Sequence, residues 1–219
     1  MKRLPLFLLA VIVVIISCKD EKPVAPIGTA PSDTAGTAKS TDQGPWVPID
    51  SATEMKAWME YATPGEMHKA LAKSNGTWDG QTTMWMAKDA PPSISKSTMT
   101  NKMVLGGRYQ FSSFKGEMMG QTFEGIAITG YDNHLKKFVS TWIDEMGTGI
   151  MKLEGQWDEP SKKITYTGKW VNPANNRECE MRQVYTLVDD NNEIMEMYGP
   201  DSKTGKEYKT MEIKLVKKK

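Results

Sequence analysis

Side chains alternate between apolar and polar at every second position over much of the chain beyond Gly76. In residues 151–157, Met151 and Leu153 fall on one face and Lys152 falls on the other. The same period of two recurs in residues 164–170 and 211–215. This alternation is typical of β-strands that bury one face and expose the other. The sequence therefore predicts a sheet in which every second side chain points toward a core.

Clusters of turn-forming residues separate the alternating segments, and no helical pattern lies between them. The clusters occupy residues 116–120, 131–134, 158–161, 189–192 and 200–205. Strands joined directly by turns form sequential antiparallel hairpins, and a long meander closes on itself to remove its edges. We therefore predict a mainly β fold, a single antiparallel up-and-down β-barrel of about eight to ten strands over residues 75–217. A two-sheet β-sandwich is the alternative architecture.

Residues 50–74 precede the predicted barrel and have a helical pattern. Ser51 and Glu54 are spaced as a capping box, in which each side chain bonds a free backbone amide of the first turn. Four apolar residues follow at helical spacing: Met55, Trp58, Met59 and Ala62. A second helix is expected with Thr63 as its N-cap and with an apolar stripe formed by Met67, Ala70 and Leu71. We expect these one or two short helices to cover one end of the barrel.

The chain begins with two cations, Lys2 and Arg3, followed by an almost wholly apolar stretch over residues 4–16. This order is typical of a secretory signal peptide. A membrane-spanning helix needs about 20 apolar residues, so the stretch is too short for a transmembrane anchor. Residues 15–18 resemble the lipobox of bacterial lipoproteins, in which the cysteine receives a diacylglycerol before cleavage. The resemblance implies that residues 1–17 are a lipoprotein signal peptide and that the lipidated Cys18 binds the membrane through its acyl chains.

The segment after Cys18 is expected to tether the folded domain. Residues 19–22 are charged and resemble a tag that directs lipoproteins of some gram-negative bacteria to the outer membrane; a solvated charged stub is the alternative. A signal for inner-membrane retention has Asp directly after the cysteine, whereas this chain has Lys19. We therefore expect a lipid-anchored envelope protein at the outer membrane, periplasmic or surface-exposed. Residues 18–49 are predicted to hold the lipidated cysteine and a disordered linker, because their polar composition lacks hydrophobic periodicity.

Formal charge and cysteine content argue against several classes of protein. The net charge of +1 falls to −1 once Lys2 and Arg3 are removed with the signal peptide. A protein that binds nucleic acid needs a basic stripe, so no nucleic-acid partner is expected. With Cys18 lipidated, Cys179 is the one cysteine left, and no internal disulfide supports the fold.

Several short motifs together resemble the bacterial family DUF1579, a domain of unknown function. The motifs lie at residues 63–68, 76–78, 103–108, 120–125, 130–133, 140–144 and 147–151. The resemblance covers about residues 62–216. It implies an antiparallel barrel and does not imply a mechanism.

Gly76 and Trp78 also resemble the Gly-x-Trp motif in the first strand of lipocalins and related calycin barrels. Those barrels place an arginine of the last strand over this tryptophan. The last predicted strand, residues 207–216, contains Lys209 and Lys214 but no arginine. The chain therefore departs from the lipocalin pattern at this point.

Aromatic side chains at inward-facing positions suggest a binding site inside the barrel. The candidate ligand-binding residues are Trp78, Arg108, Phe138, Trp142, Asp144, Tyr166 and Trp170. Asp144 shares its parity with Trp142, so its carboxylate is expected either to orient a ligand between apolar walls or to lie beyond the last buried position. Eight strands leave a barrel just wide enough for its own side chains, whereas more strands leave room for a ligand. The 16 methionines are expected to fill the core or to form a deformable apolar surface.

The sequence does not favour catalysis or metal binding. His68 falls on a predicted helix and His134 in a turn, so neither is expected to face the barrel interior. We predict no metal site, cofactor or catalytic triad. The favoured function is a membrane-tethered lipoprotein that binds a small apolar or amphipathic ligand in a β-barrel. The alternatives are a structural or interaction module of the cell envelope with a filled barrel, and an enzyme that uses carboxylate and arginine side chains in the lumen, such as Asp144 with Arg108.

Overall fold

The computed structural model describes residues 44–219. The predicted signal peptide, the predicted lipidation site at Cys18 and the linker as far as residue 43 lie outside the described residues. Residues 48–219 make up the folded unit, which holds every helix and strand of the described part.

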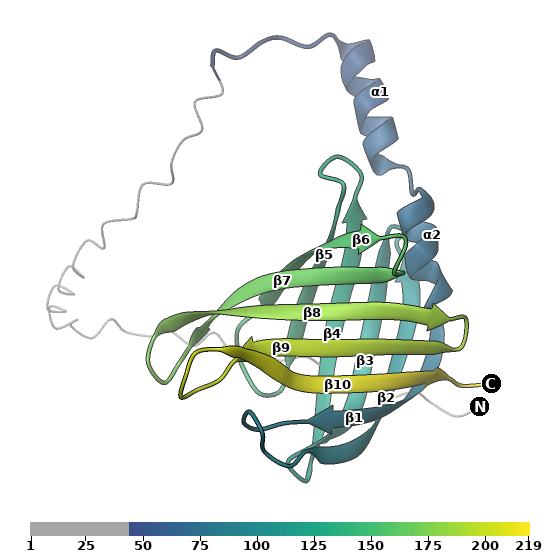
Figure 1. Cartoon of the computed structure of the whole chain (residues 1–219). Coiled ribbons are helices and arrows are strands. Elements are labelled where there is room, and N and C mark those ends of the chain that lie inside the picture. Colours follow the sequence, from purple (N-terminus) through teal and green to yellow (C-terminus); the bar gives the residue numbers. More distant parts are fainter. Residues whose placement is uncertain (1–43) are drawn as a thin grey trace, which may run out of the picture. The chain divides into compact units, whose positions relative to one another are not determined.

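Ten antiparallel strands pair in sequence order and close into a barrel (Figure 1). The strands are β1 (Gly76–Met84), β2 (Ser93–Val104), β3 (Tyr109–Met118), β4 (Gln121–Asp132), β5 (Lys137–Asp144), β6 (Met151–Asp158), β7 (Lys163–Asn172), β8 (Arg177–Asp189), β9 (Asn192–Pro200) and β10 (Glu207–Lys217). β10 pairs with β1, from Lys217 opposite Trp78 to Met211 opposite Met84, so the sheet has no free edge. The prediction of a closed up-and-down barrel is confirmed, and the alternative of a two-sheet sandwich is wrong.

The period of two in the sequence separates the inside of the barrel from the outside. In β6, Leu153 is buried and the preceding Lys152 is exposed. In β7, Ile164 and Tyr166 are buried and Thr165 between them is exposed. Alternate side chains of a strand point to opposite faces, so each strand contributes one set of side chains to the interior.

Buried apolar side chains inside the barrel form two clusters. One contains Leu71 of helix α2 (Glu66–Lys73) together with Phe138, Leu153, Ile164 and Tyr166. The other contains Trp78, Phe114, Phe123, Ile213 and Leu215. Trp78 and Phe138 have no exposed surface. A buried aromatic side chain removes about 150–250 Å² from water, so these two residues contribute strongly to the stability of their clusters.

Helix α2 ends against the barrel (Figure 1). Side chains of the strands bind its last carbonyl groups. Gln110 of β3 donates from Nε2 to the carbonyl oxygen of Leu71 at 2.7 Å. Lys217 of β10 donates from Nζ to the carbonyl oxygen of Lys73 at 3.2 Å. The last four carbonyls of a helix have no partner within the helix. The strands therefore satisfy groups that would otherwise be left unpaired next to the interior.

The carbonyl group of Ser74 joins the helix to the first strands of the barrel. It accepts hydrogen bonds from Trp78 Nε1 at 2.8 Å and from Asn101 Nδ2 at 3.2 Å. Lys217 Nζ lies 5.2 Å from the centre of a Trp78 ring. The last strand thus places a cation over the tryptophan of the first strand, but the cation is a lysine at the very end of β10 rather than the arginine of the lipocalin pattern.

Helix α1 (Ser51–Ala62) begins at a different cap from the one predicted. The N-cap is Asp50, and its Oδ1 accepts hydrogen bonds from the backbone N–H groups of Ala52 and Thr53 at 3.1 and 3.0 Å. The prediction of Ser51 as the cap is wrong by one residue. An aspartate caps as well as a serine, and its charge also interacts favourably with the helix dipole.

The start of α2 was also predicted wrongly. Thr63 terminates α1 instead of capping α2, and its Oγ1 donates to the carbonyl oxygen of Met59 at 2.6 Å. Pro64 disfavours a helical conformation at the residue before it, so the backbone is extended at Thr63 and remains extended at Gly65. Gly65 is the N-cap of α2, and its N–H group donates to Nδ1 of His68 at 3.0 Å.

The apolar stripe of α1 does not pack against the barrel as predicted. Met55, Trp58 and Met59 are 62%, 59% and 65% exposed. The hydrogen bonds between α1 and the barrel lie at the end of the helix, where Asn133 Nδ2 donates to the carbonyl oxygen of Tyr61 at 3.0 Å. Within the described residues, α2 is therefore the helix that covers an end of the barrel, because its C-terminus is bound to the strands.

A buried carboxylate lies beside the end of α2. Glu193 of β9 is 2% exposed and accepts hydrogen bonds from Ser74 Oγ and from the hydroxyl of Tyr185. Burial raises the pKa of Glu193, although the two hydrogen bonds and the charge of Lys217 act in the opposite direction. Burial also raises the pKa of Tyr185, so its hydroxyl keeps its proton and remains a donor.

We expect the substitution Glu193→Gln to change how stability depends on pH. Because the folded protein holds this proton more tightly than the unfolded chain does, Glu193 stabilises the fold most below its ordinary pKa of about 4.5. That contribution declines as the pH rises through the raised pKa of the folded protein. In thermal melts over a range of pH, the melting temperature of the wild type should fall relative to that of Glu193→Gln as the pH rises. A constant offset between the two proteins would contradict the prediction, and Glu60→Gln on the exposed α1 controls for the loss of a carboxylate.

Candidate functional site

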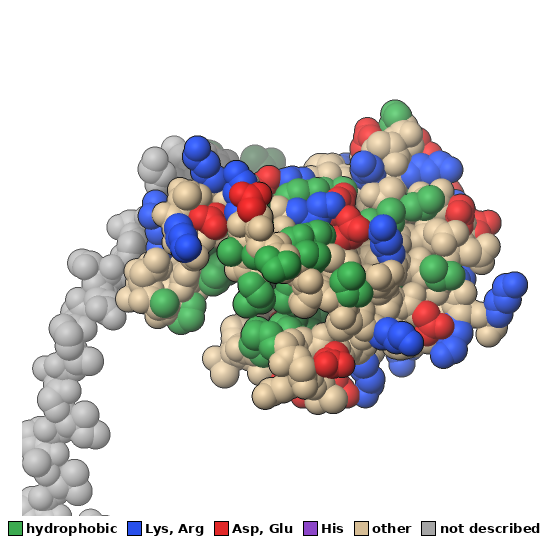
Figure 2. Space-filling model, turned by 60° about the horizontal axis from the view of Figure 1, so that its bottom comes forward, with side chains coloured by type: hydrophobic (Ala, Val, Ile, Leu, Met, Phe, Trp, Pro, Cys, Tyr) green, Lys and Arg blue, Asp and Glu red, His purple; other side chains and the backbone are tan. Residues whose placement is uncertain are grey.

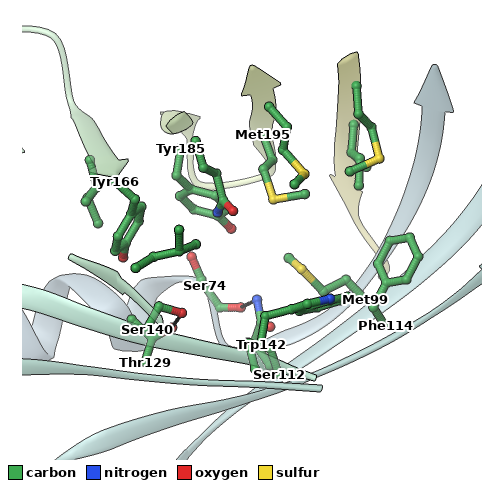
Figure 3. Close-up of a pocket in the computed structure, with 18 of the residues that line it drawn as sticks. Ser74, Met99, Ser112, Phe114, Thr129, Ser140, Trp142, Tyr166, Tyr185 and Met195 are labelled. Carbon is green, nitrogen blue, oxygen red and sulfur yellow. Dashed lines mark hydrogen bonds between the residues drawn. The ribbon is translucent and has the colours of Figure 1, made fainter. Parts of the chain in front are cut away.

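The lumen of the barrel contains a cavity of about 250 Å³. Side chains from the strands and from the end of α2 line it, including Leu71 and Ser74 (Figure 3). The barrel is therefore neither wholly filled by its own side chains nor a wide channel. Its ten strands leave room between the two buried clusters for a small molecule.

Methionines are the most frequent residue type in the cavity lining. Eight of them contribute, namely Met84, Met99, Met118, Met151, Met181, Met195, Met197 and Met211. Met211 lies directly opposite Met84 on one side and Met197 on the other, so three neighbouring strands present thioethers in one row. An unbranched thioether side chain adapts its shape at low cost. This part of the wall can therefore fit molecules of different outline.

Aromatic rings form a second part of the lining. They belong to Phe114, Phe123, Trp142, Trp157, Tyr166 and Tyr185. Phe114 contacts Phe123 edge-to-face with ring centres 6.0 Å apart, and Phe123 stacks on Trp142 at 6.5 Å. These contacts hold the rings in fixed positions, in contrast to the flexible methionines.

Polar side chains gather on the wall formed by β2, β3, β4 and β5. The residues are Asn101, Gln110, Ser112, Thr129 and Ser140, and each is less than 9% exposed. They are neighbours across the strands, because Asn101 pairs with Ser112, Gln110 with Thr129, and Thr129 with Ser140. The hydroxyl groups of Thr129 and Ser140 are 2.8 Å apart. Figure 3 shows Ser112, Thr129 and Ser140 on one side of the cavity and Tyr166, Tyr185 and Met195 on the other.

Trp142 is fixed by a hydrogen bond and by a glycine. Its indole Nε1 donates to Asp144 Oδ2 at 2.5 Å, while Asp144 Oδ1 accepts from the backbone N–H of Met146 at 2.8 Å. A Cβ atom on Gly125 would lie 2.2 Å from Trp142 Cζ2, so the indole occupies space that a larger residue would take. Asp144 thus lines the cavity and at the same time orients one of the two indole rings in its wall.

The structure brings three of the predicted site residues to the cavity and places four elsewhere. Trp142, Asp144 and Tyr166 line it. Trp78 and Phe138 face inward but are fully buried in the packed clusters.

Arg108 and Trp170 lie away from the cavity. Arg108 is exposed in the turn after β2, where its Nη1 donates to the carbonyl oxygen of Leu105 at 3.2 Å. It therefore does not meet Asp144 in the lumen, and the predicted pair of these two residues is not formed. Trp170 is half-buried near the end of β7, opposite Cys179, whereas the cavity meets this strand at Ile164 and Tyr166.

The polar wall and the extent of the methionine lining are not predicted from the sequence. Ser112 and Thr129 lie at inward positions, but a hydroxyl residue in an alternating pattern indicates an outward-facing position. The signal that could have found them is their parity with the buried Phe114 and Phe123 on the same strands.

The described residues contain no group of three or more His, Cys, Asp or Glu side chains arranged to hold a metal ion. His68 is a buried part of the α2 cap, where it contacts Tyr131 edge-to-face at 6.0 Å, and burial lowers its pKa. Cys179 is a free, half-buried cysteine. In the part of the chain that the structure describes, no helix is long and apolar enough to cross a membrane.

Comparison with known proteins identifies a family and similar solved structures. The sequence model described as "Protein of unknown function (DUF1579)" matches residues 63–217, which confirms the resemblance inferred from the motifs. No protein with a curated description matches the chain. Among solved structures, the S-type phycobiliprotein lyase CPES from Guillardia theta is similar, with a TM-score of 0.49 and 8% sequence identity. The similarity covers 74% of this chain and 97% of the lyase chain.

We expect Gly125→Ala to displace Trp142, because the new methyl group would overlap the indole ring. Overpacking of this kind lowers the free energy of unfolding by about 1–3 kcal/mol. Urea denaturation gives the loss of stability, and near-ultraviolet circular dichroism reports the displaced indole. Gly149→Ala is the matched control, because nothing lies within 4 Å of its added Cβ atom. A Gly125→Ala protein with wild-type stability and spectrum would show that the indole is not confined by this contact.

Proposed function

The chain belongs to the DUF1579 family of proteins of unknown function, and we propose that it binds a small apolar or amphipathic molecule in the lumen of its barrel. The observation that carries the proposal is a cavity of about 250 Å³ whose lining is largely apolar and includes one confined polar wall. Ligand pockets have this composition, because apolar walls supply affinity and a few polar groups orient the ligand.

The size of the cavity limits the ligand. The volume of about 250 Å³ lies just below the range of about 300–1,000 Å³ that is usual for ligand pockets, so the cavity fits a small molecule. The row of Met84, Met211 and Met197 supports some variation in shape, because these side chains change rotamer easily. Burial of apolar ligand surface in such a lumen contributes about 25 cal/mol per Å².

We propose that the ligand enters the barrel at the end opposite α2. At the α2 end, the helix is held by hydrogen bonds from Gln110, Lys217, Trp78 and Asn101. Movement of α2 would break all of them at once, whereas no helix of the described residues is bound to the other end. Figure 2 shows hydrophobic side chains gathered around a hollow on the face turned forward, as expected for an opening lined by apolar residues.

We also propose that the barrel is held at the cell envelope through a lipid on Cys18, at the outer membrane. The support is the order of sequence features: the cations, the apolar stretch over residues 4–16, the lipobox-like residues 15–18 and Lys19 after the cysteine. An acyl anchor would keep the binding domain close to a source of apolar molecules.

Filling the cavity tests the binding function. Ala127 of β4 lines the cavity, so Ala127→Phe should place a ring where the ligand would lie and weaken the binding of naphthalene by about tenfold or more. Ile128 is the next residue, is 48% exposed and points outward, so Ile128→Phe is a matched control that should leave binding unchanged. Saturation-transfer NMR measures the binding of naphthalene to the wild type and to the two variants. Failure of the wild type to bind, or equal binding by Ala127→Phe, would refute a lumenal site.

Substitution of the predicted lipidated cysteine tests the anchor. In a gram-negative host, the wild type should incorporate labelled palmitate and fractionate with the outer membrane. Cys18→Ser should incorporate no label and should leave the membrane fraction, because lipid transfer requires the thiol. Cys179→Ser is the control and should be labelled like the wild type. Labelling of Cys18→Ser would contradict the proposed anchor.

A further inference from the structure

We infer that the lumen selects an uncharged amphiphile whose hydroxyl or N–H group donates a hydrogen bond to Asn101, and that it discriminates against carboxylate ligands. This inference rests on the proposed binding function and names the class of ligand. It stands on two independent features of the cavity, namely the charges of its lining and the buried polar atom of Asn101.

The lining offers no positive charge to an anionic ligand. Among the described residues that line the cavity there is no lysine, arginine or histidine. Two carboxylates belong to the lining, Glu117 and Asp144, and both lie toward the end opposite α2. The buried carboxylate Glu193 lies beyond Ser74 at the other end. A ligand carboxylate would lose its hydration without gaining a counter-charge, and it would enter past the carboxyl groups of Glu117 and Asp144.

Asn101 has a hydrogen-bond acceptor without a partner. Its side chain lines the cavity and is 3% exposed. The amide orientation is fixed, because its Nδ2 donates to the carbonyl oxygen of Ser74 at 3.2 Å. Its Oδ1 is buried and has no hydrogen-bond partner among the described residues. An unsatisfied buried acceptor is costly, and a ligand that brings a donor to this atom would remove the cost.

The neighbours of Asn101 favour a ligand with a polar end and an apolar body. Ser112 pairs with Asn101 across β2 and β3 and also lines the cavity, so this part of the wall is polar. The hydroxyl groups of Thr129 and Ser140 bond each other, so they compete less with Asn101 for the donor group of the ligand. The opposite side of the cavity carries Met195 and the tyrosines (Figure 3). A hydroxyl or N–H group at Asn101 would therefore leave the rest of the ligand against apolar side chains.

A set of ligands with one chain length tests the inference. Octan-1-ol, 1-methoxyoctane, octanoate and octylammonium are titrated into the wild-type protein, and the heat of binding measured by isothermal titration calorimetry gives each dissociation constant. Octan-1-ol should bind at least about tenfold more tightly than octanoate and than 1-methoxyoctane, which cannot donate. Asn101→Leu should abolish the preference for octan-1-ol over 1-methoxyoctane. Octanoate binding as tightly as octan-1-ol, or octylammonium binding most tightly of all, would overturn the inference.

Asn101→Leu removes both the unpartnered acceptor and a hydrogen bond to the end of α2, and a control variant distinguishes these two effects. Lys217→Met removes a hydrogen bond to the helix, as Asn101→Leu does, but Lys217 lies outside the cavity lining. It should keep the preference for octan-1-ol, and loss of the preference in both variants would overturn the role of Asn101. The wild-type ligand series remains decisive if Asn101→Leu does not fold. Absence of binding by naphthalene and by all four ligands would refute the proposed function itself, whereas naphthalene binding without the expected selectivity would refute this inference alone.

Discussion

The pairing of β10 with β1 is the constraint on which the rest of the structure depends. Each strand of this sheet has an apolar face and a polar face, and an open sheet of the same sequence would expose two unpaired edges. Closure through the Lys217–Trp78 to Met211–Met84 register joins the two ends of the meander and gives the apolar faces a common interior. The buried clusters, the support of α2 and the cavity between them all exist because this interior is enclosed.

Closure also explains why so short a helix can cover a barrel end. α2 has only eight residues, and an isolated helix of that length is not stable in water. Its carbonyl groups at Leu71 and Lys73 bond side chains of β3 and β10, which lie at different places around the closed sheet. The barrel thus supplies the partners that the helix lacks, and the helix in turn contributes Leu71 to a buried cluster.

The barrel could be predicted from the sequence because apolar and polar residues alternate in the same way in successive strands. The inward set of β6 and β7 follows directly from alternation, and it places Tyr166 in the interior. Single residues at element ends were less predictable. Arg108 follows two glycines in a turn and lies outside the lumen, and Asp50 displaced Ser51 as a cap because several residues in a row can serve that role. The polar wall was missed for a physical reason, since Ser112 and Thr129 are polar residues on inward positions and their burial depends on what lies opposite them across the lumen.

The choice of methionine for the lumen has a chemical consequence. A thioether is oxidised to a sulfoxide, which is polar and chiral, whereas leucine or isoleucine at the same positions would be inert. Eight such sulfur atoms line one small cavity, so each oxidation event would add a strong dipole to a surface that otherwise repels water. Oxidation of these methionines would therefore reduce the capacity of the lumen for apolar ligands, and reduction of the sulfoxides would restore it.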